Sequence, residues 1–229
     1  MPPSTPTLLP PPAVETPKLF SAGHFRTEDR VRMLGWIRRY PFGTLMTIGA
    51  EGLRATSLPF VIDEDAEAGG DSPIHLVGHL AARNPHAAEL ATVGSALVVI
   101  NSPSAYISPR WYAGAANVPT WNYVGIQVRG PIEVLPGAEA RRQVLERTAS
   151  AFERAATPPW QLSDAPAELV ERLLGGIVAF RIGPCALECI EKLGQNKPGA
   201  DFTGTIAGLR AAGDEMSAAV AHLMTEVMA

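Results

Sequence analysis

Three short polar segments of the 229-residue chain carry side chains that could bind an anion or a heterocyclic ring. Gly78–Pro85 has the pattern of a strand that runs into a helix, where free backbone N–H groups and Arg83 would favour an anion. The pair Thr56–Ser57 places hydroxyls on opposite faces of a strand that Pro59 confines to an edge or a bulge. Gln195–Lys197 offers two amides and an ammonium that could read the imide edge of a heterocycle. A capping turn, strand-end hydrogen bonds or solvated side chains would also explain these patterns, so both interpretations stay open.

The aromatic residues are concentrated in one part of the chain. Between Tyr106 and Tyr123 lie two of the four tryptophans and three of the four tyrosines. Such residues accumulate where one side is apolar and the other is wet, because their polar ends need partners. Trp111, Tyr112, Trp121 and Tyr123 could therefore form a contact between subunits or a flat platform for a ring.

The sequence lacks the motifs of several common ligand sites. It has no Walker loop and no G-x-G-x-x-G, so a phosphate-bearing cofactor would not be held in the P-loop or Rossmann manner. It also has no serine nucleophile elbow, and its five histidines are too scattered to favour a metal site. Cys185 and Cys189 fall four positions apart in an expected strand, about 13 Å, which is too far for a disulfide. We interpret them as reduced structural thiols.

Size and charge limit the class of protein. With 46% apolar residues and a net charge of −4, the chain suits a globular protein with a full core and lacks the basic character of a general nucleic-acid binder. No run approaches the roughly 18 apolar residues of a membrane span, and the start of the chain has no secretory leader pattern. We expect a cytoplasmic protein with a proline-rich arm at residues 1–17 and a single domain at residues 18–229.

The periodicity of the sequence predicts strands followed by helices. A first helix is expected over Thr27–Tyr40, with Thr27 as its N-cap and Pro41 as its stop. Strands are expected at residues 43–48, 53–62, 74–78, 96–101, 119–134 and 176–190, with a hairpin turn at 49–52. Further helices are expected at residues 84–92, 137–155, 164–174, 201–211 and 214–227. Because the early connections are too short for parallel crossovers, we expect an α+β protein with an antiparallel β-barrel core.

Several segments also occur in the order of a known family. They are Pro41–Leu45, Ala55–Pro59, Gly78–Ala81, Asn84–Pro85, Ala105–Pro109, Trp111–Tyr112, Val118–Tyr123 and Gln195–Pro198. Together they resemble the PaiB-type family of FMN-binding negative transcriptional regulators, over about residues 41–198. The Pro-Thr-Trp-Asn-Tyr sequence that ends at Tyr123 is the most specific of these motifs.

The resemblance implies a fold, a cofactor and a partner. The fold would be a six-stranded antiparallel split β-barrel with peripheral helices, as in pyridoxamine phosphate oxidases and flavin reductases. The chain would form a homodimer with an FMN site at the subunit interface. The residues implied for the phosphate and ribityl groups are Thr56, Ser57, His79, Leu80, Ala81, Arg83 and Asn84. Those implied near the isoalloxazine are Trp121, Asn122, Tyr123, Gln195 and Lys197.

Besides a flavin-dependent redox or regulatory role, two other functions remain open. A DNA-binding transcriptional repressor would use a basic first helix, although no helix-turn-helix pattern is present. The basic residues there are Arg26, Arg30, Arg32, Arg38 and Arg39. A haem or small-molecule oxidoreductase on the same fold would need a histidine ligand, for which His79 and His222 are the candidates.

Overall fold

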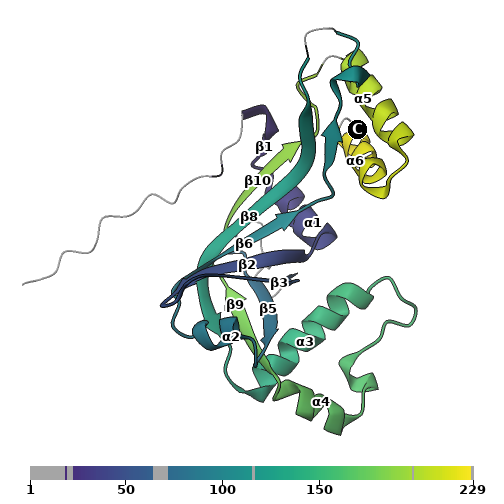
Figure 1. Ribbon diagram of the computed structural model, residues 1–229. Helices are drawn as coiled ribbons and strands as arrows, with labels where there is room; N and C mark the ends of the chain where they lie inside the picture. The colour runs from purple at the N-terminus through teal and green to yellow at the C-terminus, as the bar shows by residue number, and fades with distance from the viewer. Residues whose placement is uncertain (1–18, 20–22, 64–71, 115–116, 198, 228–229) are drawn as a thin grey trace, which may run out of the picture.

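The computed structural model describes residue 19 and residues 23–63, 72–114, 117–197 and 199–227. The predicted proline-rich arm at 1–17 lies outside these residues, as does most of the segment between residues 63 and 73. Strands form one large sheet and helices lie at its margins (Figure 1). Among the described helices, none has the length and apolar character needed to cross a membrane.

The described residues form ten strands and six α-helices. The strands are β1 (Arg26–Thr27), β2 (Phe42–Gly49), β3 (Gly52–Pro59), β4 (Val61–Ile62), β5 (Leu76–Ala81), β6 (Ser95–Asn101), β7 (Ala105–Ile107), β8 (Thr120–Val134), β9 (Ile177–Ile182) and β10 (Ala186–Lys192). The helices are α1 (Arg30–Arg39), α2 (Pro85–Glu89), α3 (Gly137–Glu153), α4 (Ala167–Leu174), α5 (Gly199–Ala212) and α6 (Glu215–Glu226).

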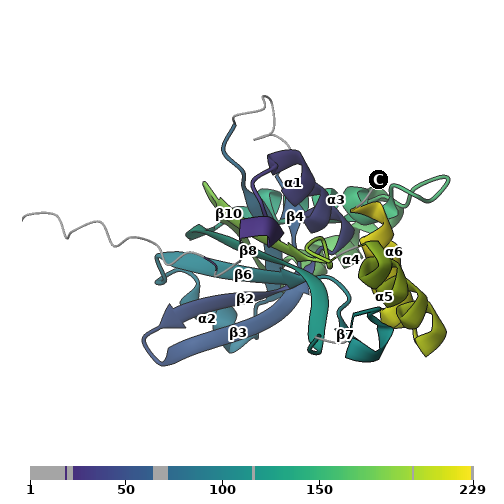
Figure 2. The same cartoon turned by 90° about the horizontal axis from the view of Figure 1, so that it is seen from above.

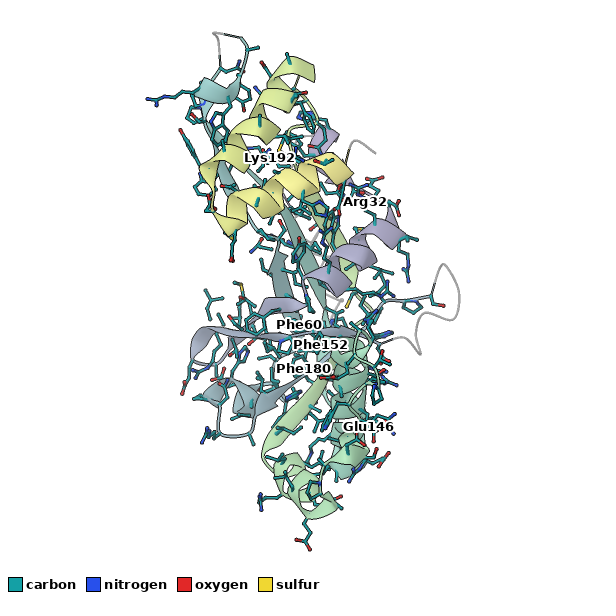
Figure 3. The ribbon with its side chains drawn as sticks, turned by 90° about the vertical axis from the view of Figure 1, so that its right-hand side faces the viewer. Arg32, Phe60, Glu146, Phe152, Phe180 and Lys192 are labelled. Carbon is teal, nitrogen blue, oxygen red and sulfur yellow. The ribbon has the colours of Figure 1, made fainter. Side chains whose placement is uncertain are left out.

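Six strands form the barrel, in the order β3-β2-β6-β8-β9-β5, and their pairs are antiparallel. β5 returns against β3, where a Cβ added to Gly78 would lie 3.3 Å from the Leu58 side chain. Phe60 and Phe180 pack edge to face in the interior, with ring centroids 6.4 Å apart (Figure 3). The predicted α+β class and six-stranded split barrel are confirmed.

The sheet divides at β8. Residues Tyr123–Arg129 of β8 pair with β10, and the last three residues of β8 pair with β9. Strand β6 pairs with the other edge of β8. The partner changes at Gly130, where a Cβ would lie 2.9 Å from the carbonyl oxygen of Pro184. The prediction of one strand over residues 176–190 is wrong, because Gly183, at φ 144°, and Pro184 turn the chain between β9 and β10.

The first helix begins later than predicted. α1 starts at Arg30, and Asp29 caps it by accepting a hydrogen bond from Arg32 N at 3.1 Å. Thr27, the predicted N-cap, lies instead in β1 opposite Cys189. That prediction is wrong because pairing with β10 extends the backbone at Thr27, and Asp29 offers an equally good cap.

A buried carboxylate ties α1 to the sheet. Glu191 of β10 accepts hydrogen bonds from Trp36 Nε1 and Arg32 Nε, both at 2.6 Å. Removing one partner of such a buried charged group is expected to be costly, because the other would remain desolvated. This anchor fixes the helix that precedes the barrel.

α5 packs directly on the aromatic segment. A Cβ added to Gly204 would overlap the carbonyl oxygen of Trp111, and one added to Gly208 would overlap its indole ring. The two glycines therefore let α5 approach closely, and Trp111 acts as a packing residue. In Figures 1 and 2, α5 and α6 lie together at the end of the molecule remote from α2.

Both cysteines are free thiols. Cys189 is buried in β10, whereas Cys185 lies in the turn before that strand. Burial raises the pKa of Cys185 to about 11 and that of Cys189 to about 12. Both thiols are therefore protonated at neutral pH and are poor nucleophiles, in agreement with the predicted structural role.

Candidate functional site

The short helix α2 closes the end of the barrel that holds Thr56. His86 of α2 is 1% exposed, and its two ring nitrogens lie 2.9 Å from Thr47 Oγ1 and from Thr56 Oγ1. Desolvation lowers the pKa of His86, so the ring is neutral at pH 7, with one donor and one acceptor nitrogen. The Thr56 hydroxyl, predicted to contact a phosphate, is thus already hydrogen-bonded within the chain.

The charges around His86 are also paired. Arg54 Nε donates to Glu89 Oε1 at 2.7 Å, and the same guanidinium forms an ion pair with Glu51. The hydrogen bond from Arg54 lowers the pKa of Glu89 and keeps this carboxylate ionised. Its second oxygen is a buried atom without a hydrogen-bond partner among the described residues. The α2 network, as we call His86, Thr47, Thr56, Arg54 and Glu89, is otherwise closed.

The other residues of the predicted phosphate group surround this end. His79 is half-buried in β5, and desolvation lowers its pKa. Leu80 is buried in the core, whereas Ala81 is exposed at the end of the strand. Asn84 caps α2 by accepting a backbone N–H of that helix at 3.0 Å. Arg83 is exposed and makes no hydrogen bond or ion pair with the described residues, so its charge is available to a ligand.

The outward side of β2, β3 and β6, which we call the outer sheet face, is apolar and uncharged. Phe42, Ile48 and Leu53 on this face are 64%, 73% and 81% exposed. The neighbouring residues of the face are Thr44, Met46, Ala55, Ser57, Leu97 and Val99. Ser57 is the second predicted hydroxyl, and its Oγ lies 3.5 Å from Thr44 Oγ1. Contiguous exposed apolar surface of this kind marks an interaction site.

Trp121 and Tyr123 extend the outer sheet face along β8. Gln127 of β8 pairs with Val99 of β6, so alternate residues of β8 from Gln127 back to Trp121 share that side. Trp121 is 53% exposed and packs edge to face on Tyr106, with ring centroids 6.1 Å apart. This aromatic pair presents a flat surface, as the platform interpretation requires.

Asn122 points to the opposite side of β8, toward a pocket beneath α5 and α6. The pocket, which we call the lysine pocket, has a volume of about 180 Å³. Lys192, at the end of β10, and Lys197, in the loop before α5, both line it, and Figure 3 shows Lys192 at the end of the molecule that carries α5 and α6. Its other lining residues are Phe25, Tyr112, Val118, Thr120, Gly194, Asn196, Phe202, Thr205 and Met224.

Gln195 holds the turn after β10. Its Oε1 accepts a hydrogen bond from Leu193 N at 2.9 Å, and its Nε2 donates to the carbonyl oxygen of Glu191 at 2.5 Å. Both ends of the amide are therefore used within the turn. The capping interpretation of this residue accounts for all the contacts that the structure gives it.

The two predicted groups of ligand contacts lie apart in one chain. In register, Thr56 pairs with Leu45, Leu45 with Val98, and Val98 with Val128. Val128 comes six positions after Asn122, which is about 20 Å along β8 at roughly 3.3 Å per residue. Figures 1 and 2 show α2 well away from the α5–α6 pair. A ligand that touched both groups would require a second chain.

Sequence interpretation missed His86 and Lys192. His86 was hidden because its partners, Thr47 and Thr56, come from two other strands. For Lys192 a signal exists in the composition, because the chain has 16 arginines and only three lysines. Two of those three lysines meet in one pocket.

The basic residues of the first helix are largely used within the chain. Arg32 is bonded to Glu191, and Arg39 forms an ion pair with Glu226 at 2.6 Å. Arg30 donates to a backbone carbonyl. The described part of α1 therefore offers no row of free cations for a DNA backbone, and a DNA-binding role is not favoured.

The histidines considered as haem ligands do not form a common site. His79 lies in β5, whereas His222 lies on α6, where its Nε2 is 3.0 Å from Glu226 Oε1. Within the described residues no three metal-ligating side chains come together. A haem role is likewise not favoured.

Sequence comparison identifies the family. Residues 19–183 match the family model described as "Putative FMN-binding domain". The chain belongs to this family. Protease synthase and sporulation protein PAI 2 of Bacillus subtilis is 27% identical over 206 residues, which cover 89% of this chain and 95% of that relative. The PaiB-type resemblance seen in the motifs is confirmed.

Solved structures support the same fold. The FAD and haem binding protein from Mycobacterium smegmatis has a TM-score of 0.56 and 18% identity, and the match covers 82% of this chain and 80% of that one. The flavocytochrome Anf3 from Azotobacter vinelandii has a TM-score of 0.55 and 11% identity, covering 79% and 75%. With the family match, they make this chain a flavin-binding split-barrel protein.

Proposed function

We propose that the chain acts as a homodimer that binds FMN between its subunits, in a redox or regulatory role. The observation that carries the proposal is the outer sheet face, which is uncharged over β2, β3 and β6 and continues along β8 to Trp121, where its charged residue Arg129 is paired with Glu188. The centres of homodimer interfaces are apolar and depleted of charge. A second copy of the chain is therefore the partner that this face fits.

Two-fold symmetry would also bring the separated groups together. In an isologous contact, residue i of one chain meets residue j of the other, and j meets i. The Ser57 end of one subunit would then face the Trp121 end of its partner. Two equivalent sites would form, each built from both chains.

At the Ser57 end, the residues fit an anionic group. Arg83 has a free guanidinium, which can bind a phosphate in bidentate fashion, and the Ser57 hydroxyl is exposed on β3. His79, Leu80 and Ala81 supply the neighbouring wall, with Asn84 shaping the turn and Thr56 held by the α2 network beneath.

At the Trp121 end, the exposed aromatic surface fits a flat ring. Trp121 and Tyr123 would contact the isoalloxazine, while Asn122, Gln195 and Lys197 support this end of β8 from the other side and from the following turn. FMN supplies electron or hydride transfer when bound. The protein residues bind the flavin, orient it and exclude water.

Flavin titration tests the site. The purified protein is expected to show flavin absorbance, or to gain it with FMN, and to bind FMN more tightly than riboflavin because of the phosphate. Arg83→Met should weaken FMN binding by about tenfold or more and leave riboflavin binding unchanged, since a hydrogen bond to a charged group is lost. Equal affinities of the wild-type protein for FMN and riboflavin would contradict the phosphate assignment.

Light scattering tests the dimer. Leu53→Glu places a charge on the outer sheet face and should give a monomer that no longer binds FMN. Val31→Glu is the matched control, because Val31 is equally exposed but lies on α1, away from that face. A wild-type monomer, or a monomeric variant that retains FMN, would overturn the interface.

The domain organisation follows from the same proposal. Residues 18–229 would act as one domain in the cytoplasm, with residues 1–17 as an appended arm. Removal of the arm should leave FMN affinity and dimer mass unchanged. A loss of FMN affinity or of the dimer mass would show that the arm contributes to the proposed flavin site.

A further inference from the structure

The lysine pocket brings together two ammonium groups that form no direct ion pair with a carboxylate of the described residues. Lys197 Nζ donates to Asn117 Oδ1 at 2.8 Å and lies 4.3 Å from the centroid of the Tyr112 ring. Lys192 Nζ donates to Thr120 Oγ1. Two cations therefore line one small cavity.

The acidic residue of α5, Asp201, is linked to Lys197 only through the amide of Asn117. Asp201 is buried, and its Oδ1 accepts hydrogen bonds from Ala113 N at 2.7 Å and from Gly114 N at 3.3 Å. Its other oxygen lies 3.5 Å from Asn117 Nδ2. The carboxylate is thus occupied in fixing the loop that follows Tyr112.

A buried amide in the pocket is also incompletely paired. Asn122 is 2% exposed, and its Nδ2 donates to Met224 Sδ at 3.3 Å. A thioether sulfur is a weak acceptor, and the amide oxygen accepts no hydrogen bond from the described residues. The amide of Asn122 therefore lines the cavity with its oxygen available to a ligand, while the fully buried unpaired side-chain atoms of the described residues are His75 Nδ1 and Glu89 Oε2.

The composition makes the presence of two lysines informative. Sixteen of the nineteen basic residues are arginine, and Lys192 and Lys197 are two of the three lysines. An ammonium is a compact point charge on a flexible stem, whereas a guanidinium is larger and planar. In a cavity of about 180 Å³, a lysine ammonium fits beside a small anionic group more readily than an arginine guanidinium does.

Much of the remaining lining is apolar, beside the polar Thr120, Asn196 and Thr205. Phe202 and Met224 are buried, and Phe25 and Val118 lie at the same cavity. An inorganic anion would make no apolar contact with these side chains. A ligand with one anionic group and an apolar body would satisfy both parts of the cavity.

We propose that the lysine pocket is a second ligand site, which binds a small apolar carboxylic acid with its carboxylate between Lys192 and Lys197. The amide of Asn122 lies beside the carboxylate, and the apolar body contacts Phe202 and Met224. This site differs in its lining from the proposed flavin surface, because neither Trp121 nor Tyr123 lines the cavity, although Lys192 pairs with Tyr123 across β10 and β8. It does not depend on flavin being bound.

The test compares benzoate with its neutral analogue benzamide, by calorimetric titration of the full-length protein. The wild-type protein should bind benzoate at least about tenfold more tightly than benzamide. Lys197→Met and Lys192→Met should each weaken benzoate binding by about tenfold, the effect expected for one hydrogen bond to a charged group. Benzamide binding should persist in both variants, which shows that the cavity is intact.

Arg210→Met is the matched control, because it removes one positive charge from an exposed position of α5 outside the cavity. It should leave benzoate binding unchanged. Equal binding of benzoate and benzamide, or an equal loss in Arg210→Met, would overturn the carboxylate site. Inorganic phosphate that binds as tightly as benzoate would overturn the role of the apolar walls.

Repeating the titration with saturating FMN separates this proposal from the proposed function. Unchanged benzoate affinity is expected, since Trp121 and Tyr123 do not line the lysine pocket. Displacement of benzoate by FMN would overturn the assignment of a separate site. A protein that binds benzoate but never FMN would reject the proposed function and retain the lysine pocket.

Discussion

The α2 network and the lysine pocket both bury polar side chains, but they do so in opposite ways. In the α2 network, His86 is hydrogen-bonded through both ring nitrogens and Arg54 is paired with Glu89, whose second oxygen alone has no partner among the described residues. In the lysine pocket, two ammoniums lack carboxylates and Asn122 meets a sulfur atom. Polar groups that satisfy one another stabilise the fold. Polar groups whose hydrogen bonds or charges lack partners within the chain are found where a ligand can supply the partner.

The largest expected effect breaks the α2 network. His86→Ala should lower the free energy of unfolding by about 3 kcal/mol, because it leaves Thr47 and Thr56 unpaired and opens a cavity in the barrel end. Urea unfolding followed by tryptophan fluorescence measures this. His222→Ala, at an exposed position of α6, is the control and should change stability by less than about 0.5 kcal/mol. A loss below about 1 kcal/mol in His86→Ala would show that the network contributes little.

The next effect concerns the packing of α5, which covers the lysine pocket. Gly208→Ala should destabilise the protein by about 2 kcal/mol, because the new methyl group overlaps the Trp111 indole and forces α5 outward. Gly35→Ala in α1 has open space around the new methyl group and should instead stabilise by about 0.5–1 kcal/mol. Thermal unfolding of the two variants tests the contrast. Equal effects would mean that α5 does not depend on close contact with Trp111.

A smaller effect is expected from removing a polar group of the pocket. Asn122→Leu should change stability by less than about 1 kcal/mol in either direction, because the amide has only a weak partner and leucine has a similar size. Chemical unfolding measures it beside His86→Ala. If Asn122→Leu proved as costly as His86→Ala, the proposed difference between the two regions would disappear.

The smallest effect is a pH dependence confined to the α2 end. The pKa values of His79 and His86 are both lowered from 6.5 by desolvation. Below pH of about 6.5 the unfolded chain therefore binds protons that the folded chain does not, so stability falls as the pH is lowered. Above that pH both states are neutral and the dependence vanishes. Urea unfolding at pH 7.5 and 5.5 should show the fall, and His86→Ala should show less of it. An increase in stability at pH 5.5 would contradict the assignment.

Local signals in the sequence gave many elements correctly. The hairpin of β2 and β3, the cap at Asn84 and the long strand β8 follow from turn residues, capping chemistry and alternation. The first helix was placed three residues early because Thr27 and Asp29 are both suitable caps. Pairing of Thr27 with Cys189 of β10 decides between them, and that contact spans most of the chain.

The sequence by itself determined the strand pattern, the two C-terminal helices and the family motifs, because each depends on residues close together in the chain. Only the tertiary structure showed that Asn122 and Trp121 face opposite sides of β8 into different surroundings, and that Thr56 is bonded to His86. It alone brought Lys192 and Lys197 to one cavity. These outcomes depend on strand register and on the packing of α5 and α6, and no local pattern encodes contacts between segments so far apart in the chain.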